Sequence, residues 1–139
     1  MNYVILITHG KFAEGLHDTL KMFVGEREDV LSIGLRAGED VAALASRINE
    51  CCKSFNENDQ FIVLGDMIGG SPLTTLMNCF SEHNLLKRSV ILGGLNLAMA
   101  LNAVLMKEGS LEDCKAAALR EGMQAVNEVK LSSDDDDEI

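Results

Sequence analysis

The sequence has no tryptophan, a single proline and only four cysteines among its 139 residues. The cysteines are Cys51, Cys52, Cys79 and Cys114, and no two of them form a C-x-x-C pair. This spacing argues against a zinc site, and we expect no bound metal. Adjacent cysteines rarely bond to each other for geometric reasons, so we expect reduced and mostly buried thiols.

Long apolar runs are also missing. No run approaches the roughly 18 residues that are needed to cross a bilayer. Met1, Asn2 and Tyr3 lead directly into an expected strand, with neither a basic segment nor a cleavage site before it. We therefore expect no signal peptide, and a cytoplasmic location.

Positive charge is scarce, since 12 Lys and Arg stand against 22 Asp and Glu, a formal net charge of −10. An acidic chain argues against nucleic acid as a partner and against adsorption to anionic lipid, because both need basic patches. Part of the charge is local, in the acidic run over 134–138. We expect residues 132–139 to be a disordered, solvating tail, and residues 1–131 to form one domain.

Three familiar motifs are absent as well. The chain has no G-x-x-x-x-G-K-[ST] loop, no G-x-G-x-x-G after its first expected strand, and no G-x-S-x-G elbow. A bound nucleotide is therefore not expected, and we expect no cofactor.

What is present is a regular alternation of two periods. Apolar, β-branched runs predict strands over 3–8, 30–35, 61–65 and 89–92, with a short final strand over 126–131. Helical spacing predicts helices over 11–24, 39–55, 71–83, 97–106 and 111–125. This order predicts an α/β, doubly wound, mostly parallel sheet in the order 2-1-3-4, with helices on both faces.

The starts of three helices carry capping signals. Ser71 is followed by Pro72, Asn96 precedes an apolar helix, and Ser110 opens a segment that resembles a capping box. Within the first helix, residues at helical spacing predict a buried stripe of Phe12, Leu16, Leu20 and Phe23.

The chemistry is expected at the carboxyl ends of the strands, where doubly wound sheets bind their ligands. The first strand ends at His9 and the third at Asp66. In the predicted order these strands are neighbours, so the two side chains would face each other across a crevice. A carboxylate that accepts one imidazole N–H fixes the tautomer and stabilises positive charge on the ring, as a nucleophilic histidine requires. We therefore predict that His9 and Asp66 are catalytic.

Glycines surround this predicted pair. Gly69, Gly70 and Ser71 open a helix, and another helix begins just after Gly10. Glycines allow close approach of the backbone, and N–H groups at a helix start attract an anion. We predict that these four residues bind a phosphoryl group. Each feature alone also fits a structural role, and the weight comes from their coincidence at one edge of the sheet.

The other two histidines lack such neighbours. His17 falls inside an amphipathic helix, off its apolar stripe, and His83 lies at a helix end, where it suits the helix dipole. We expect neither of them to be catalytic.

Three segments, "VILITHGKFAEGL", "GDMIGGSPLTTLMN" and "GGLNLAMAL", resemble signature segments of the mannose-family enzyme IIA of the bacterial sugar phosphotransferase system. The resemblance covers roughly residues 1–131. It implies that His9 accepts a phosphoryl group on Nε2 from phospho-HPr and passes it to enzyme IIB. Enzyme IIB then phosphorylates the sugar that enters through the membrane components IIC and IID. Asp66 would bind the imidazole Nδ1–H, and Ser71 with loop N–H groups would hold the phosphate.

The resemblance also implies a homodimer in which the strand over 126–131 pairs antiparallel with the partner's sheet. Two departures occur, with Ala98 in place of a proline and Leu73-Thr74 in place of Phe-Asn. The loops around the site would be the docking surface for partner proteins, and we expect Met67, Asn96 and Met99 at its rim.

Two other functions fit some of these features. One is the phosphocarrier subunit of a dihydroxyacetone kinase, which shares the architecture and the histidine after the first strand. The motif "GGSP" favours the sugar-transport branch. The other is a non-catalytic regulatory module in which His9 and Asp66 only bind an anion. The sequence names no sugar, because enzyme IIA does not contact it.

Overall fold

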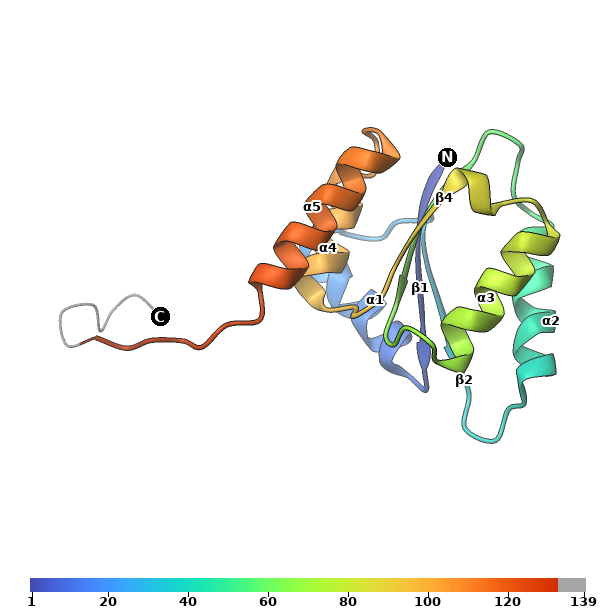
Figure 1. The fold of residues 1–139 in the computed structure, drawn as a ribbon, viewed down its shortest axis with the longest axis horizontal. Helices are drawn as coiled ribbons and strands as arrows, with labels where there is room; N and C mark the ends of the chain where they lie inside the picture. Colours follow the sequence, from blue (N-terminus) through green and yellow to red (C-terminus); the bar gives the residue numbers. More distant parts are fainter. Residues whose placement is uncertain (133–139) are drawn as a thin grey trace.

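A parallel sheet of four strands forms the centre of the molecule (Figure 1). The structure is a computed structural model, and it describes residues 1–132. The strands are β1 (Asn2–His9), β2 (Val30–Leu35), β3 (Gln60–Gly65) and β4 (Ser89–Leu92). Their order is β2-β1-β3-β4 and all neighbouring pairs are parallel, which confirms the predicted topology.

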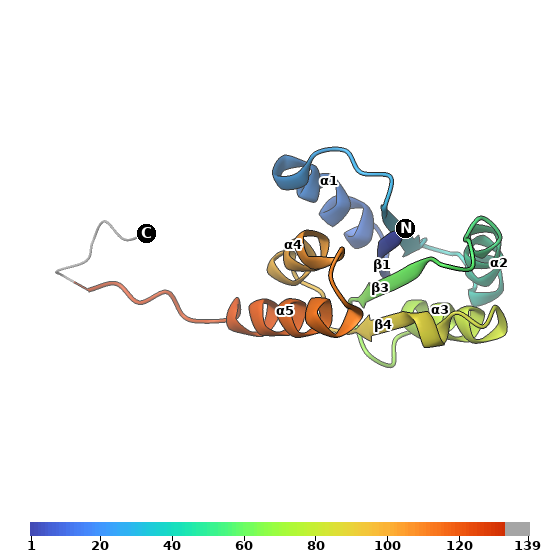
Figure 2. The same ribbon diagram turned by 90° about the horizontal axis from the view of Figure 1, so that it is seen from above.

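Helices cover both faces of this sheet (Figure 2). One face carries α1 (Phe12–Val24), α4 (Leu97–Met106) and α5 (Leu111–Gln124). The other face carries α2 (Val41–Cys52) and α3 (Ser71–Glu82), and a short 3-10 helix, η1 (Leu86–Arg88), leads into β4. Strands that are buried on both faces must be apolar throughout, which is why these strands read as continuous hydrophobic runs.

Alternate residues of β1 enter two separate cores. Val4 and Leu6 pack with α1, α4 and α5, while Ile5 and Ile7 pack with α2 and α3. All four are fully or almost fully buried. The alternation follows from the period of two in a strand, and it fixes β1 at the centre of the fold.

The buried stripe of α1 differs from the prediction. Ala13, Leu16 and Leu20 face the core, whereas Phe12 is 47% exposed and Phe23 is also exposed. Neighbouring residues on a helix are about 100° apart, so burial of Ala13 turns Phe12 away from the core. The sequence prediction favoured Phe12 because it is large and apolar. In the structure the small Ala13 packs against the core instead.

The caps of two helices are confirmed. The Asn96 side chain accepts a hydrogen bond from Met99 N–H at 2.9 Å at the start of α4. The Ser110 side chain accepts from Asp113 N–H at 3.1 Å at the start of α5. The prediction that Ser71 caps α3 is wrong, because Gly70 occupies the N-cap position and Ser71 is the first helical residue.

The predicted strand over 126–131 does not form within this chain. After α5 these residues leave the domain as an extended, exposed segment (Figure 1). A strand needs a neighbour for its backbone groups, and the described part of the chain offers none there. Pairing with a second copy therefore stays a prediction, and residues 133–139 of the predicted acidic tail lie outside the described residues.

The four cysteines are all unpaired, and Cys52, Cys79 and Cys114 are buried. This confirms the expected reduced thiols. Among residues 1–132, no helix has the length and apolar character that a membrane span requires.

Candidate functional site

His9 and Asp66 meet at the carboxyl edge of the sheet, between β1 and β3. The imidazole Nδ1 of His9 lies 2.8 Å from Oδ2 of Asp66. The chain runs from β1 outward to β2 and then crosses back to β3, so this edge is the topological switch point of the sheet. The predicted pair is therefore brought together at the predicted edge of the sheet.

Three hydrogen bonds hold the Asp66 carboxylate. Oδ2 accepts from the His9 backbone N–H at 2.9 Å as well as from the imidazole, and Oδ1 accepts from Met67 N–H at 2.9 Å. Partial burial raises the pKa of Asp66, but the bonds from His9 and Met67 outweigh it and leave the pKa below its ordinary value. The carboxylate is therefore ionised at neutral pH and can only accept hydrogen bonds.

This acceptor sets the state of the imidazole. Because ionised Asp66 only accepts, Nδ1 of His9 carries the hydrogen and the neutral ring keeps its lone pair on Nε2. The His9 side chain is 46% exposed, whereas that of Asp66 is 13% exposed. The arrangement can present a nucleophilic nitrogen to a partner while the carboxylate stabilises the charge that develops on the ring.

The Thr8 side chain fixes the backbone around His9, a role that the sequence analysis did not predict. The Thr8 side chain is fully buried, and its Oγ1 accepts from Ala13 N–H at 2.7 Å and donates to the His9 carbonyl at 3.1 Å. One hydroxyl thus joins the end of β1 to the first turn of α1. The signal for it was a polar residue at the last position of the strand predicted over 3–8.

Gly70 lies directly against the imidazole. A Cβ at this position would come within 3.0 Å of Cε1 of His9 and 3.4 Å of Cβ of Met67. The loop can therefore approach the ring this closely only without a side chain at Gly70. Gly69, one residue earlier, occupies the exposed turn of the same loop.

The two helices that begin beside His9 differ from the others at their N-termini. The N-cap side chains of Asp40, Asn96 and Ser110 cap α2, α4 and α5, whereas the N-cap residues of α1 and α3 make no such bond. In α1 the Ala13 N–H is bonded by Thr8, so the free N–H groups are mainly those of α3. The first N–H groups of a helix have no partner inside it. At this edge the uncapped N–H groups and two helix dipoles can attract an anion.

The predicted phosphate ligands divide into two groups. Gly10 N–H donates to the Leu35 carbonyl at 2.8 Å, so this N–H is not free for a phosphate, and binding of a phosphoryl group at Gly10 stays a prediction. Strand β2 takes up that donor instead. The Ser71 side chain is exposed and makes no hydrogen bond within residues 1–132, so its hydroxyl and the N-terminus of α3 remain available.

The predicted rim needs correction at two positions. Met67 is exposed beside the site, as expected. Met99 is only 3% exposed and packs in the core, and the Asn96 amide donates to the Gly122 carbonyl at 2.9 Å, which ties α4 to α5. The exposed apolar side chains in the segments that directly follow His9 and Asp66 are those of Phe12, Met67 and Ile68.

The other histidines have structural partners. Nδ1 of His17 lies 2.9 Å from Ser32 Oγ, and Nε2 of His83 lies 3.0 Å from Asn49 Oδ1. Burial lowers the pKa of His17, and nearby Lys21 adds to this. Within residues 1–132 there is no group of three or more His, Cys, Asp or Glu side chains that could hold a metal ion.

This fold and this edge geometry define an α/β protein with an exposed, carboxylate-bound histidine at the switch point of its sheet. Residues 3–119 match the family described as "PTS system fructose IIA component" (EIIA-man). The chain belongs to this family and is a phosphocarrier component of a sugar phosphotransferase system.

Characterised relatives agree with this assignment. The chain is 25% identical over 105 residues to the "PTS system fructose-specific EIIA component" of Bacillus subtilis, covering 76% of this chain and 70% of the relative. It is also 25% identical over 129 residues to the "PTS system mannose-specific EIIAB component" of Escherichia coli K12. That match covers 91% of this chain but only 39% of the longer relative.

Solved structures share the fold. The mannose/sorbose specific IIA subunit from Enterococcus faecalis superposes with a TM-score of 0.83 at 26% identity, covering 95% of this chain and 97% of that one. A component EIIA from Streptococcus agalactiae gives a TM-score of 0.80 at 25% identity, covering 92% and 97%. These matches do not favour a dihydroxyacetone kinase subunit or a non-catalytic regulatory module.

Proposed function

We propose that His9 carries the phosphoryl group, accepting it from phospho-HPr and passing it to enzyme IIB. The observation that carries the proposal is the 2.8 Å contact of Nδ1 with Asp66, which leaves Nε2 without a partner in residues 1–132, on a side chain that is 46% exposed. Residues 1–131 are the proposed phosphocarrier domain. The proposed location is the cytoplasm, where both partner proteins would meet it.

In the proposed step the Nε2 lone pair of His9 attacks the phosphorus of phospho-HPr. An Nε2–P bond forms while the P–N bond to the HPr histidine breaks, and that histidine keeps the electron pair. Positive charge develops on the His9 ring, and the Asp66 carboxylate stabilises it through Nδ1–H. Transfer to a histidine of enzyme IIB repeats the exchange in the opposite direction.

The phosphoryl oxygens need donors in this step. The proposed donors are the Ser71 hydroxyl and the uncapped N–H groups at the start of α3, with the start of α1 adding a second dipole. Gly70 lets these groups reach the ring, because a side chain there would collide with His9. Catalysis of phosphoryl transfer consists almost entirely of positioning and electrostatic stabilisation.

The docking surface for the partner proteins is the proposed role of the exposed apolar side chains around His9. Met67 and Ile68 follow Asp66, and Phe12 begins α1. Exposed apolar side chains gathered at one edge are typical of a protein interface. A homodimer in which residues 126–131 pair with the partner's sheet remains part of the proposal, and sedimentation of the full chain tests it.

An intact-mass measurement tests the proposal directly. The protein is incubated with phosphoenolpyruvate, enzyme I and HPr, and we expect the mass of one acid-labile phosphoryl group to be added. We expect no addition in His9→Ala. Because the His9 side chain is exposed, this substitution should change the free energy of unfolding by no more than about 0.5 kcal/mol. His17→Ala is the matched control and keeps the addition.

Two outcomes would contradict the proposal. One is an addition that survives His9→Ala, which would place the phosphoryl group elsewhere. The other is a wild-type protein that gains no mass while HPr in the same mixture is phosphorylated.

A further inference from the structure

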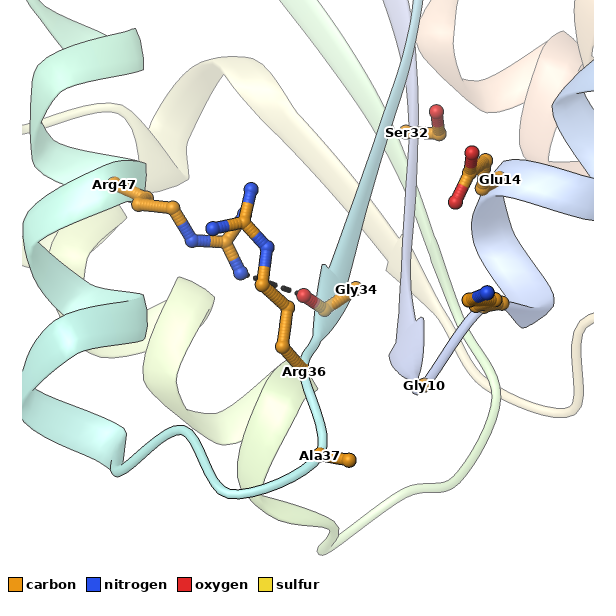
Figure 3. A pocket seen from close by; sticks show the side chains of 8 residues that line it. Gly10, Glu14, Ser32, Gly34, Arg36, Ala37 and Arg47 are labelled. Atoms are coloured by element: carbon orange, nitrogen blue, oxygen red, sulfur yellow. Dashed lines mark hydrogen bonds between the residues drawn. The ribbon is translucent and has the colours of Figure 1, made fainter.

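A cavity of about 580 Å³ lies at the free edge of β2 (Figure 3). In the strand order β2-β1-β3-β4 this edge is on the opposite side of β1 from Asp66, which follows β3. Its lining comes from α1, β2, the following loop and α2, and it includes Lys11, Glu14, Ser32, Gly34, Arg36 and Arg47. Only Gly10, at its margin, is shared with the surroundings of His9. A volume of this size suits a small organic molecule.

One wall of the cavity is formed by the unpaired edge of β2. β2 pairs only with β1, and the carbonyls of Asp29 and Leu35 accept from that side. Alternate residues of a parallel strand turn their backbone groups to the same neighbour, so Ser32 and Gly34 turn theirs to the free edge. The Gly34 carbonyl accepts from Arg47 Nη2 at 2.6 Å, which leaves the other edge groups for a ligand.

Two guanidinium groups point to this edge (Figure 3). Arg47 is held in place by Glu39, with contacts of 2.7 and 2.9 Å. The hydrogen bond from Arg47 and one from the Arg36 backbone lower the pKa of Glu39 to about 2, so this carboxylate stays ionised. The side chains of Arg36 and Lys11 form no ion pair within 4.0 Å among residues 1–132, although the Arg36 charge also attracts Glu39.

The opposite side of the cavity has different chemistry. Glu14 contributes a carboxylate, and Ser32 contributes a hydroxyl that also contacts His17. A carboxylate repels a bare anion but accepts hydrogen bonds from hydroxyl groups. Guanidinium groups bind phosphate through paired, charge-assisted hydrogen bonds. The two sides together fit a ligand that has a phosphate at one end and hydroxyl groups at the other.

We propose that this cavity is a second binding site, for a small polyhydroxylated organic phosphate of the sugar phosphate class. The phosphate lies at Arg36 and at Nη1 of Arg47, the guanidinium nitrogen to which the described residues supply no partner. The hydroxyl groups lie at Glu14 and Ser32. The site does not depend on the role proposed for His9, since it lies on the other side of β1. It does lie against the same loop, because a Cβ at Gly34 would come within 2.1 Å of the Gly10 carbonyl oxygen.

Titration calorimetry on the full chain tests the site with glucose 6-phosphate, glucose and inorganic phosphate as probes. We expect glucose 6-phosphate to bind at one site, more tightly than inorganic phosphate, and glucose to give no heat. Arg36→Gln should weaken the binding of glucose 6-phosphate at least about tenfold, because it removes a charge-assisted contact. Arg120→Gln, on the exposed side of α5, is the matched control and should leave it unchanged.

His9→Ala separates this site from the proposed phosphocarrier site. Binding that persists in His9→Ala, with amide shifts at Ser32 and Gly34 in NMR spectra, supports the cavity whatever the role of His9. Binding that is lost in His9→Ala overturns the proposal, because the ligand would then lie at the catalytic edge. So does the absence of binding at millimolar glucose 6-phosphate, or equal weakening by Arg36→Gln and Arg120→Gln.

Discussion

The two ends of the sheet treat their polar groups in opposite ways. At the amino end the N-terminal ammonium binds Asp59 at 2.8 Å, and Lys107 Nζ binds Asp29 at 2.5 Å. At the carboxyl end one ring nitrogen of His9 has no partner within residues 1–132, and the N-cap residues of α1 and α3 make no side-chain bond. Paired charges stabilise the first end, while the second keeps its hydrogen-bonding capacity for a ligand.

The amino end is built around a buried lysine. The Lys107 side chain is 1% exposed, and its Nζ contacts Asp29 and Glu108. Burial lowers the pKa of Lys107, but the two carboxylates outweigh it and hold the pKa above its ordinary value. Asp29 also accepts two hydrogen bonds from Arg27, each of 2.9 Å. A buried charge with such partners is costly to unpair.

Asp66→Asn at the carboxyl end should have the largest effect on function. The amide can donate to the imidazole, which favours the tautomer with its hydrogen on Nε2 and removes the nucleophilic lone pair. By comparison with the carboxylate of a Ser-His-Asp triad, we expect phosphorylation of His9 to slow on the order of 10⁴-fold. Rapid-quench measurement with phospho-HPr gives the rate, and circular dichroism checks that the fold persists. An unchanged rate would make Asp66 purely structural.

Asp29→Asn at the amino end should lower stability and leave function unchanged. It leaves Lys107 buried with only the exposed Glu108 as an ionic partner, so we expect the free energy of unfolding to fall by about 3 kcal/mol. The rate of His9 phosphorylation should not change. Urea denaturation measures the first quantity, and Glu108→Gln is the control, with an expected loss below about 1 kcal/mol. A loss of activity in folded Asp29→Asn would break the distinction between the two ends.

The pH dependence of stability sharpens the same comparison. The hydrogen bond from Arg27 lowers the pKa of Asp29, burial opposes this and Lys107 adds to it, which leaves a value of about 2. The folded pKa lies below the unfolded one, near 3.9, so this stabilisation is complete above about pH 5 and is lost as the pH falls toward 2. The stability difference between wild type and Asp29→Asn, measured by urea denaturation, should shrink below about pH 4. A difference that stays constant down to pH 3 would contradict the assignment.

A pair of serine substitutions should give the smallest effects. Ser110→Ala removes the cap of α5 and should lower the free energy of unfolding by about 1 kcal/mol. Ser71→Ala removes a hydroxyl without a partner in the described residues, so its cost should stay below about 0.5 kcal/mol. It should nevertheless slow His9 phosphorylation, whereas Ser110→Ala should not. Equal stability losses in the two variants would show that Ser71 is also a cap.

The sequence predicted the strands and the meeting of His9 with Asp66 for the same reason. A doubly covered parallel strand must be apolar along its whole length, so the polar residues that end it stand out. The errors fall where a side chain's role depends on its neighbours. Ser71 looks like a cap until the backbone places Gly70 there, and Met99 looks like a rim residue until α5 covers it.

The sequence by itself determined the order of the elements, the caps at Asn96 and Ser110, and the edge at which the chemistry lies, because these follow from local periodicity and from topology. Only the tertiary structure decided which donors stay free. The Gly10 N–H donates a hydrogen bond to β2, and Lys107 forms an ion pair with Asp29, which is far away in the sequence. Such pairings join residues far apart in the sequence, so no local pattern carries them. The same reason hid the cavity at β2, whose cations come from three separate segments.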